Sequence, residues 1–215
     1  MGKVRFEISM SLDGFTAGPN ASLEQPLGEG GEGLHEWGVR LASWRRLHGL
    51  EGGETGADDD MLEESFATAG ATIMGRRMFS GGEGPWEDDP RRDGWWGDAP
   101  PFHTPVFILT HHAREPQQME GGTSFTFVTE GIEAALEQAR AAAGEKDVAV
   151  GGGASIARQC LEAGLLDELT IHLVPVLLGG GVRLFEGIDP AKVELEPVRV
   201  IDSPGVTHLT FRAAR

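Results

Sequence analysis

The sequence is poor in basic residues, in cysteine and in long apolar runs. It has 18 lysines and arginines against 34 aspartates and glutamates, a formal net charge of −16. Nucleic acids and anionic membrane surfaces bind proteins through clustered cations, so we expect neither as a partner. The one cysteine, Cys160, allows neither an internal disulfide nor a cysteine-based metal site. No stretch resembles a signal peptide or reaches the roughly 20 apolar residues of a membrane helix, which indicates a cytoplasmic protein.

Several catalytic motifs are also missing. The sequence contains no P-loop, no G-x-S-x-G nucleophile motif and no H-E-x-x-H zinc motif. A literal G-x-G-x-x-G occurs at residues 28–33, but it does not lie between a predicted strand and helix. Its glutamates would also repel a pyrophosphate. An ordinary Rossmann dehydrogenase, which needs this motif after the first strand, is therefore disfavoured.

Glycine is abundant, at 32 of 215 residues, and hydrophobic residues make up 40% of the chain, which favours a folded core over disorder. Apolar periodicity predicts strands at residues 4–10, 71–74, 105–110, 124–129, 147–150, 169–178 (interrupted by Pro175), 193–201 and 206–212, and helices at 34–47, 58–69, 131–143 and 154–163. Strands and helices alternate in the middle and strands pair at the end. We therefore expect an α/β fold, with a mostly parallel mixed sheet and an antiparallel carboxyl-terminal hairpin, in a single domain over residues 1–215.

Residues 80–104 interrupt this pattern with glycines, prolines, aspartates and three tryptophans that follow no period. A loop of this length in a compact domain is usually functional or disordered. Trp37 and Trp86 are candidates to stack on a flat heterocycle, although Trp37 also fits the core. Trp95 and Trp96 favour a lid or a subunit contact.

The clearest candidate site is the turn from the strand at 147–150 into the helix at 154–163. Gly151–Gly153 would let a phosphate approach the backbone, the amides at the helix start would bind it, and Ser155 would add a hydroxyl donor. The alternative is that the three glycines only make a tight turn.

Two further candidate sites also follow strands. Gly75, Arg76 and Arg77 come after the strand at 71–74, and the segment from Thr110 to Arg114 comes after the strand at 105–110. Ligands of α/β sheets bind outside these carboxyl ends, although the arginines could equally be solvated. The adjacent histidines at 111 and 112 would face opposite sides of a strand and have no third ligand nearby, so we expect no metal. Together the three sites predict a dinucleotide along one sheet edge.

The candidate proton donors are Asp13 and the run Asp58–Asp60. Asp13 follows the first strand and could orient or protonate a ligand, but Asp-Gly is also a common turn pair. The aspartates at 58–60 could equally serve the first turn of a helix, where the helix dipole is positive.

Four segments in this order resemble the dihydrofolate reductase superfamily, and most closely the branch that contains the riboflavin-biosynthesis reductase (RibD C-terminal) domain. They are Ser-Leu-Asp-Gly at 11–14, Met-Gly-Arg-Arg at 74–77, Gly-Gly-Gly-Ala-Ser at 151–155, and the glycine-, leucine- and proline-containing segment 164–181. The resemblance covers residues 3–212. It implies about eight mixed strands flanked by helices and NADPH as cofactor.

The resemblance also implies roles for individual residues. It places Asp13 at the catalytic centre, and Asp59 or Asp60 at the spacing of the helix carboxylate, of which we take Asp59. We also expect Trp37, Trp86 and Leu178 to lie beside the substrate. The residues implied to contact the cofactor are Met10, Gly14, Gly75, Arg76, Arg77, Thr110, His111, Arg114, Gly151, Gly152, Gly153, Ala154, Ser155 and Ile156. Thr110, His111 and Arg114 would lie at the adenosine end. No basic cluster matches the one that holds the ribose phosphate in the riboflavin enzymes.

These observations predict an NADPH-dependent oxidoreductase that transfers hydride to a C=N or C=O group of a small pterin-like, pyrimidine-like or carbonyl substrate. The alternative is a non-catalytic nucleotide-binding protein that retains the fold. We expect a homodimer, to which the apolar segment Leu173–Leu178 could contribute.

Overall fold

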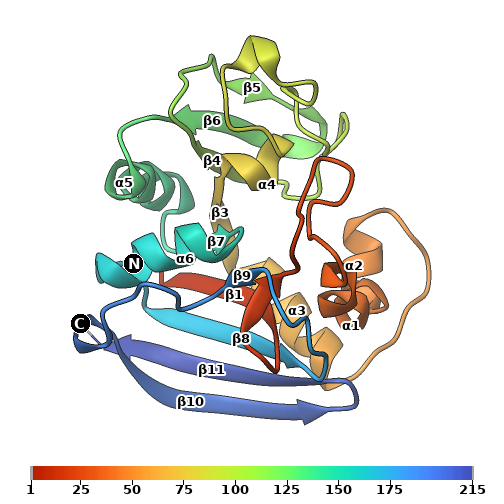
Figure 1. Ribbon diagram of the computed structural model, residues 1–215. Coiled ribbons are helices and arrows are strands. Elements are labelled where there is room, and N and C mark those ends of the chain that lie inside the picture. The colour runs from red at the N-terminus through yellow and green to blue at the C-terminus, as the bar shows by residue number, and fades with distance from the viewer. Residues whose placement is uncertain (1, 215) are drawn as a thin grey trace.

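The structure is a computed structural model that describes residues 2–214. Nine of the strands it describes form one sheet (Figure 1): β1 (Val4–Ser11), β3 (Ala69–Gly75), β4 (Pro105–Leu109), β5 (Gln117–Gln118), β6 (Ser124–Val128), β7 (Asp147–Gly151), β8 (Glu168–Val174), β10 (Glu194–Ser203) and β11 (Val206–Ala214). Their order is β10-β11-β8-β1-β7-β3-β4-β6-β5. A separate two-stranded sheet joins β2 (Phe15–Ala17) to β9 (Val182–Arg183).

The strand directions confirm the predicted fold class. Neighbours from β8 through β1, β7, β3 and β4 to β6 are parallel, whereas β10, β11 and β5 pair antiparallel at the edges. The sheet has nine strands rather than about eight. The two-residue edge strand β5 has no apolar alternation and gives no signal in the sequence.

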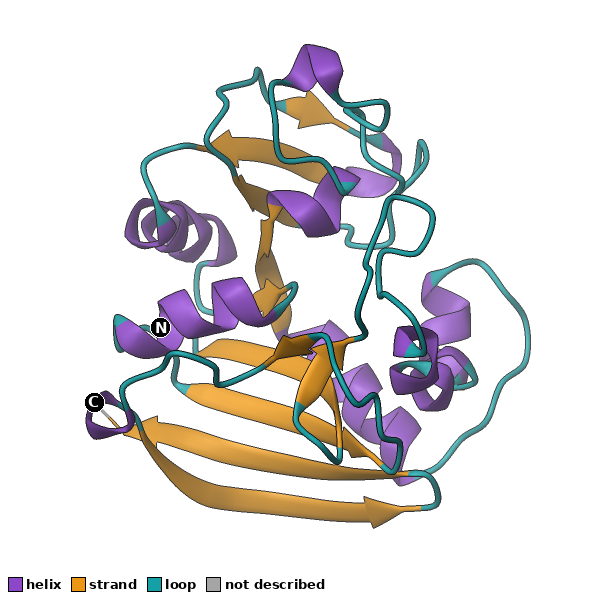
Figure 2. Ribbon diagram, viewed as in Figure 1, coloured by secondary structure: helices purple, strands orange, loops and turns teal. Residues whose placement is uncertain are grey.

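Helices cover both faces of the sheet (Figure 2). They are α1 (Glu36–Val39), α2 (Ala42–Leu47), α3 (Ala57–Thr68), α4 (Arg76–Ser80), α5 (Ile132–Ala143) and α6 (Ala154–Glu162), with short 3-10 helices at Gly31–Leu34, Trp86–Asp88, Glu120–Gly122 and Pro190–Lys192. None of these described helices has the length and apolarity needed to cross a membrane.

Two predicted elements end earlier than their apolar patterns. The helix predicted over 34–47 is broken, because Leu41 is extended (φ −71°, ψ 146°) and forms a bridge with Glu54. Its apolar residues Leu34, Trp37 and Leu41 are nonetheless buried. The strand predicted over 169–178 ends at Val174, since Pro175 has no N–H for the ladder.

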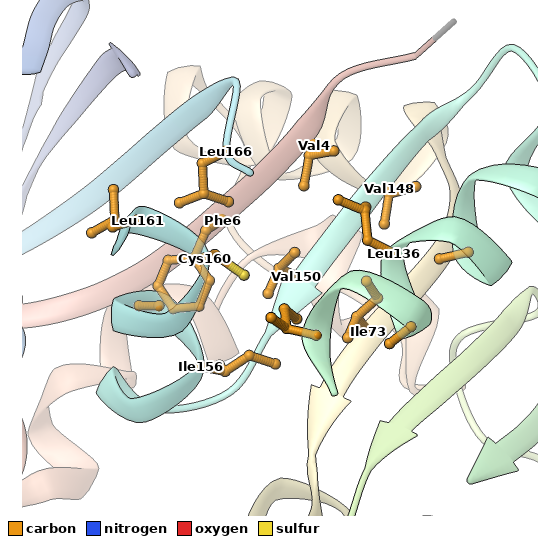
Figure 3. Packing of buried hydrophobic residues seen from close by; sticks show 14 of the residues in the cluster. Val4, Phe6, Ile73, Leu136, Val148, Val150, Ile156, Cys160, Leu161 and Leu166 are labelled. Atoms are coloured by element: carbon orange, nitrogen blue, oxygen red, sulfur yellow. The ribbon is translucent and has the colours of Figure 1, made fainter. Parts of the chain in front are cut away.

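The main core lies between the sheet and the pair α5 and α6 (Figure 3). On β1, Val4, Phe6 and Ile8 face this core, so Arg5, Glu7, Ser9 and Ser11 face the opposite way. Cys160 of α6 is buried in the core, and this burial raises the pKa of its thiol to about 12. The polar side of β1 faces α1–α3, where the cleft described next begins.

Candidate functional site

A long, open cleft crosses the carboxyl ends of β3, β4 and β7 and continues along the face of β1 and β8 that lies under α1–α3. At its first end, Met74 is the register partner of Gly151, and Gly75 is the partner of Leu109. The three strand ends singled out in the sequence therefore lie side by side. We call the residues Gly75, Thr110 and Gly151–Gly153 the glycine end of the cleft.

The turn at Gly151–Gly153 needs glycine at its centre. Gly152 has φ +125°, and a Cβ there would lie 3.2 Å from Cγ2 of Ile156 and 3.7 Å from the backbone nitrogen of Gly75. A Cβ on Gly153 would meet no atom within 4 Å. Gly153 precedes α6, whose first residues, Ala154 to Ile156, also line the cleft. The turn is a cradle with its backbone open to the cleft, and the amides of a helix start favour an anion there.

The two arginines after β3 have different environments. Arg76 is only 7% exposed, and its guanidinium donates to Oγ of Ser80 (2.8 Å) and Oδ2 of Asp89 (2.5 Å). It also stacks on Trp86, with Cζ 3.2 Å from the ring centroid. The side chain of Arg76 therefore supports residues 80–104, while its predicted contact with a cofactor phosphate stays a prediction. Arg77 is exposed and forms an ion pair with Glu83.

Asp13 fastens the loop after β8 to the end of β1. Its carboxylate accepts hydrogen bonds from Ser11 Oγ (2.6 Å) and from the backbone N–H groups of Gly179 (2.7 Å) and Leu178 (3.2 Å). The Ser11 bond, together with the two amides, lowers the pKa of Asp13 to about 2. A carboxyl group with this pKa is ionised at neutral pH. The three hydrogen bonds that stabilise the carboxylate therefore argue against Asp13 as a proton donor. Gly14 turns the chain here with φ +87°.

Asp59 also has a structural contact in place of the catalytic role that was expected. It is buried, and its Oδ1 accepts a 2.7 Å hydrogen bond from the backbone N–H of Ser43 in the first turn of α2. Asp59 therefore caps α2, while it also lies in the acidic first turn of α3. This arrangement favours the helix-terminus interpretation over the catalytic one.

The cleft is lined by some of the predicted site residues and not by others. Those that line it are Trp37, Gly75, Arg76, Arg77, Thr110, His111 and Gly151 through Ile156. Those that do not are Met10, Asp13, Gly14, Asp59, Trp86, Arg114 and Leu178.

The other predicted site residues that do not line the cleft make contacts elsewhere in the protein. Met10 packs against the main core, and the side chain of Leu178 packs in the cluster around Leu34 and Trp37. Trp86 lies under Arg76, and its Nε1 donates to the carbonyl of His112 (2.7 Å). Arg114 pairs with Asp93 (2.5 Å), which holds it to residues 80–104.

Sequence reasoning missed a set of polar residues on one face of the sheet. Their positions are Arg5, Glu7, Ser9, Thr170, His172 and His208, and we call this set the polar face of the sheet. Four of them, Arg5, Glu7, Ser9 and His172, line the cleft. Trp37 contacts it, donating from Nε1 to Oγ of Ser9 at 3.2 Å. The alternation of residues 4–10 carried a signal, but the same alternation describes a strand with one face in water.

The order and directions of the strands define a dihydrofolate-reductase-like fold. The chain resembles a putative riboflavin biosynthesis protein from Shewanella sp. PV-4, with 21% identity, TM-score 0.62 and 99% of both chains covered. It also resembles dihydrofolate reductase from Enterococcus faecalis complexed with NADP(H) and RAB-propyl, with 16% identity, TM-score 0.53, and 100% of this chain and 98% of that one covered.

A third similar structure is the diaminohydroxyphosphoribosylaminopyrimidine deaminase/5-amino-6-(5-phosphoribosylamino)uracil reductase from Thermotoga maritima. It has 14% identity and TM-score 0.57, and the match covers 99% of this chain but 57% of that one. No curated protein matches this chain. The family description of the RibD C-terminal domain matches residues 2–209, so the chain belongs to that family. This confirms the resemblance stated from the sequence.

Proposed function

We propose that this protein is an NADPH-dependent reductase, in a single domain over residues 1–215, that reduces a C=N or C=O group of a small heterocyclic or carbonyl substrate. Its membership of the RibD C-terminal domain family supports a reductase. The observation that carries the proposal is the glycine end, where the ends of β3 and β7 present glycine backbone, and the end of β4 presents Thr110, to one cleft.

The residues of the cleft fit a nicotinamide dinucleotide. Gly75 and Gly151–Gly153, with the hydroxyl of Ser155, would hold the phosphates, because a side chain at Gly152 would fill the cradle. His111, which is exposed at the end of β4, would lie toward the adenosine. When bound, the cofactor supplies a hydride. The protein supplies orientation through the cleft surface along Ser9, Thr16 and Trp37.

We place the substrate at the other end of the cleft, over the polar face of the sheet, and this end favours a ligand without a phosphate group. Arg5 lies there, but its Nε is 3.0 Å from Oδ2 of Asp147, and its Nη2 donates to Oγ1 of Thr68 (2.5 Å). The pyrimidine reductase from Thermotoga maritima has a phosphoribosyl compound in its name. Because the guanidinium of Arg5 is already bound to Asp147 and Thr68, an uncharged or cationic heterocycle is the better candidate substrate for this protein.

A non-catalytic nucleotide-binding protein is the second candidate. It is favoured by one observation: Asp13 and Asp59, the carboxylates expected at the catalytic centre, are both engaged in structural hydrogen bonds. In either case we propose a cytoplasmic homodimer. Edge strand β10 exposes Val198 and Val200, and a particle of 23.0 kDa in light scattering would contradict the dimer.

The test has two stages. Quenching of protein fluorescence measures NADPH binding, and loss of NADPH absorbance measures turnover with dihydrofolate, 5-amino-6-(5-phosphoribosylamino)uracil and a panel of small imines and ketones. We expect binding and oxidation by at least one compound. Binding without oxidation by any of them would support the second candidate, and no binding would contradict both.

A further inference from the structure

The polar face is unusual because its side chains are buried under α1–α3 rather than solvated. In the register of the sheet, Glu7 is opposite Thr170, and His172 is opposite both Ser9 and His208. Three strands that are distant in the sequence thus bring one carboxyl group and two imidazoles together. Glu7 and His172 both line the cleft.

Glu7 has one oxygen bound and one free. Its Oε1 accepts a 2.8 Å hydrogen bond from Oγ of Ser65 on α3 and lies 3.8 Å from Nη1 of Arg5. Its Oε2 has no hydrogen-bond partner within residues 2–214, and Nε2 of His172 lies 4.0 Å away. The side chain is 23% exposed. Asp13 differs, because both of its oxygens are bound within the protein.

The surroundings of Glu7 favour the neutral acid. Burial raises the pKa of its carboxyl group, and the negative charges of Glu168 and Glu64 act in the same direction. The Ser65 hydrogen bond and Arg5 oppose this effect without reversing it. Arg5 is itself paired with Asp147.

The two histidines form a chain whose proton positions are determined by Asp58. Burial lowers the pKa of both imidazoles, to about 3 for His172, so both are neutral at pH 7. Nε2 of His208 lies 3.1 Å from Oδ1 of Asp58 and therefore carries its proton. Nδ1 of His208 is then an acceptor, 2.8 Å from Nδ1 of His172, which must be the donor. Nε2 of His172 is left unprotonated beside Oε2 of Glu7.

We propose that Glu7 is the acid that protonates a C=N substrate, and that His172, His208 and Asp58 are positioning residues that keep it ready to do so. An acceptor at Nε2 of His172 favours the protonated carboxyl group over the carboxylate. This inference rests on the proposed reductase function. It assigns the acid to a strand in the floor of the cleft rather than to Asp13 or Asp59.

The proposed step balances. Glu7 donates the proton on Oε2 to the substrate nitrogen, while the hydride of the reduced nicotinamide forms the new bond to carbon. The π electron pair of the C=N bond forms the N–H bond, so the substrate gains two electrons and the nicotinamide loses two. The resulting carboxylate takes a proton from water in the open cleft.

The main test is Glu7→Gln, with Glu63→Gln as the matched control, because Glu63 is an exposed carboxylate on α3 that is paired with Arg46 and does not contribute to the pKa shift of Glu7. With the compound that the wild type reduces, we expect Glu7→Gln to lower kcat by about 100-fold, the usual contribution of a general acid, with NADPH affinity unchanged. Wild-type kcat should fall as pH rises through the pKa of Glu7, and this fall should be absent in the variant. Wild-type kcat with the same pH profile would overturn the proposal.

A second measurement needs no substrate. Because the folded-state pKa of Glu7 lies above its ordinary value of 4.5, the folded state binds more protons than the unfolded state above pH 4.5. Wild-type stability should therefore fall relative to Glu7→Gln as pH rises above 4.5, in urea unfolding. A difference that does not change with pH would overturn the proposal, even if no compound is reduced and the reductase function fails.

The positioning chain has its own variant. Asp58 lies partly at the surface, so Asp58→Asn should fold, but it removes the carboxylate that determines the histidine proton positions. We expect the fall in kcat to move to lower pH, with the plateau at acid pH retained. A pH profile identical to that of the wild type would overturn the role of this chain.

Discussion

The two ends of the cleft differ in the chemical groups that they present. The glycine end consists of backbone at the ends of adjacent strands, and the buried cation beside it, Arg76, is paired inside the protein. The polar face consists of side chains in the middle of strands, with partners on α3 and the sheet. Phosphates need only amides and space, whereas proton transfer needs a particular side chain in a particular environment.

The largest effect should come from Arg76, beside the glycine end. Arg76→Ala leaves the buried carboxylate of Asp89 without its ion-pair partner, with only the hydrogen bonds from Ser80 and the Arg91 N–H remaining, and breaking a buried ion pair costs about 3–5 kcal/mol. Urea unfolding measures this loss, with Arg77→Ala as the control, because its exposed pair should contribute about 0–1 kcal/mol. If Arg76→Ala instead weakened NADPH binding with stability unchanged, Arg76 would be a ligand, and the glycine end would not rely on backbone alone.

A smaller effect should come from the cradle itself. Gly152→Ala combines a strained φ with contacts to Ile156, so we expect NADPH affinity to fall by on the order of 100-fold, about 2.7 kcal/mol. Gly33→Ala is the control, because Gly33 lies outside the cleft, its Cβ would meet no protein atom within 4 Å, and stability should stay within about 0.5 kcal/mol. Fluorescence titration with NADPH distinguishes the two variants. If Gly152→Ala bound NADPH with wild-type affinity, the glycine turn would not be the phosphate site, and the contrast between a backbone end and a side-chain end of the cleft would fail.

The smallest effect concerns the adenosine side of the glycine end. We expect NADPH to bind at least about tenfold more tightly than NADH, a difference of about 1.4 kcal/mol. His111→Ala should reduce this preference, because His111 lines the cleft. Arg114→Ala should leave the preference unchanged, since the guanidinium is held by Asp93. The opposite result in parallel titrations would place the adenosine against residues 80–104.

The sequence predicted the fold and the glycine end because both leave local patterns. Apolar periodicity located the long strands and the helices α5 and α6, and a strand followed by glycines located each turn. The break at Leu41 depends on pairing with Glu54, which no local pattern shows. The interruption of the strand at Pro175 was predicted, because proline has no N–H for the ladder, and β8 ends at Val174.

The polar face could not be predicted in the same way. Glu7, His172 and His208 lie on three strands that meet only in the folded sheet. Before folding, Glu7 looks like any outward residue of an alternating strand. Asp13 and Asp59 looked more catalytic because they follow recognisable local patterns. Their hydrogen bonds to Gly179 and Ser43 show that such patterns also build loops and helix ends.

The central place of β1 has a consequence for how the chain folds. Its register partners include Val148 on β7 and Glu168 on β8, so the first strand synthesised pairs only after most of the chain exists. Pairings this distant in sequence slow folding, because a long loop must close first. Until then, Val4, Phe6 and Ile8 remain without the core that buries them. We therefore expect emerging chains that end before β7, at about residue 145, to depend on chaperones and to aggregate without them.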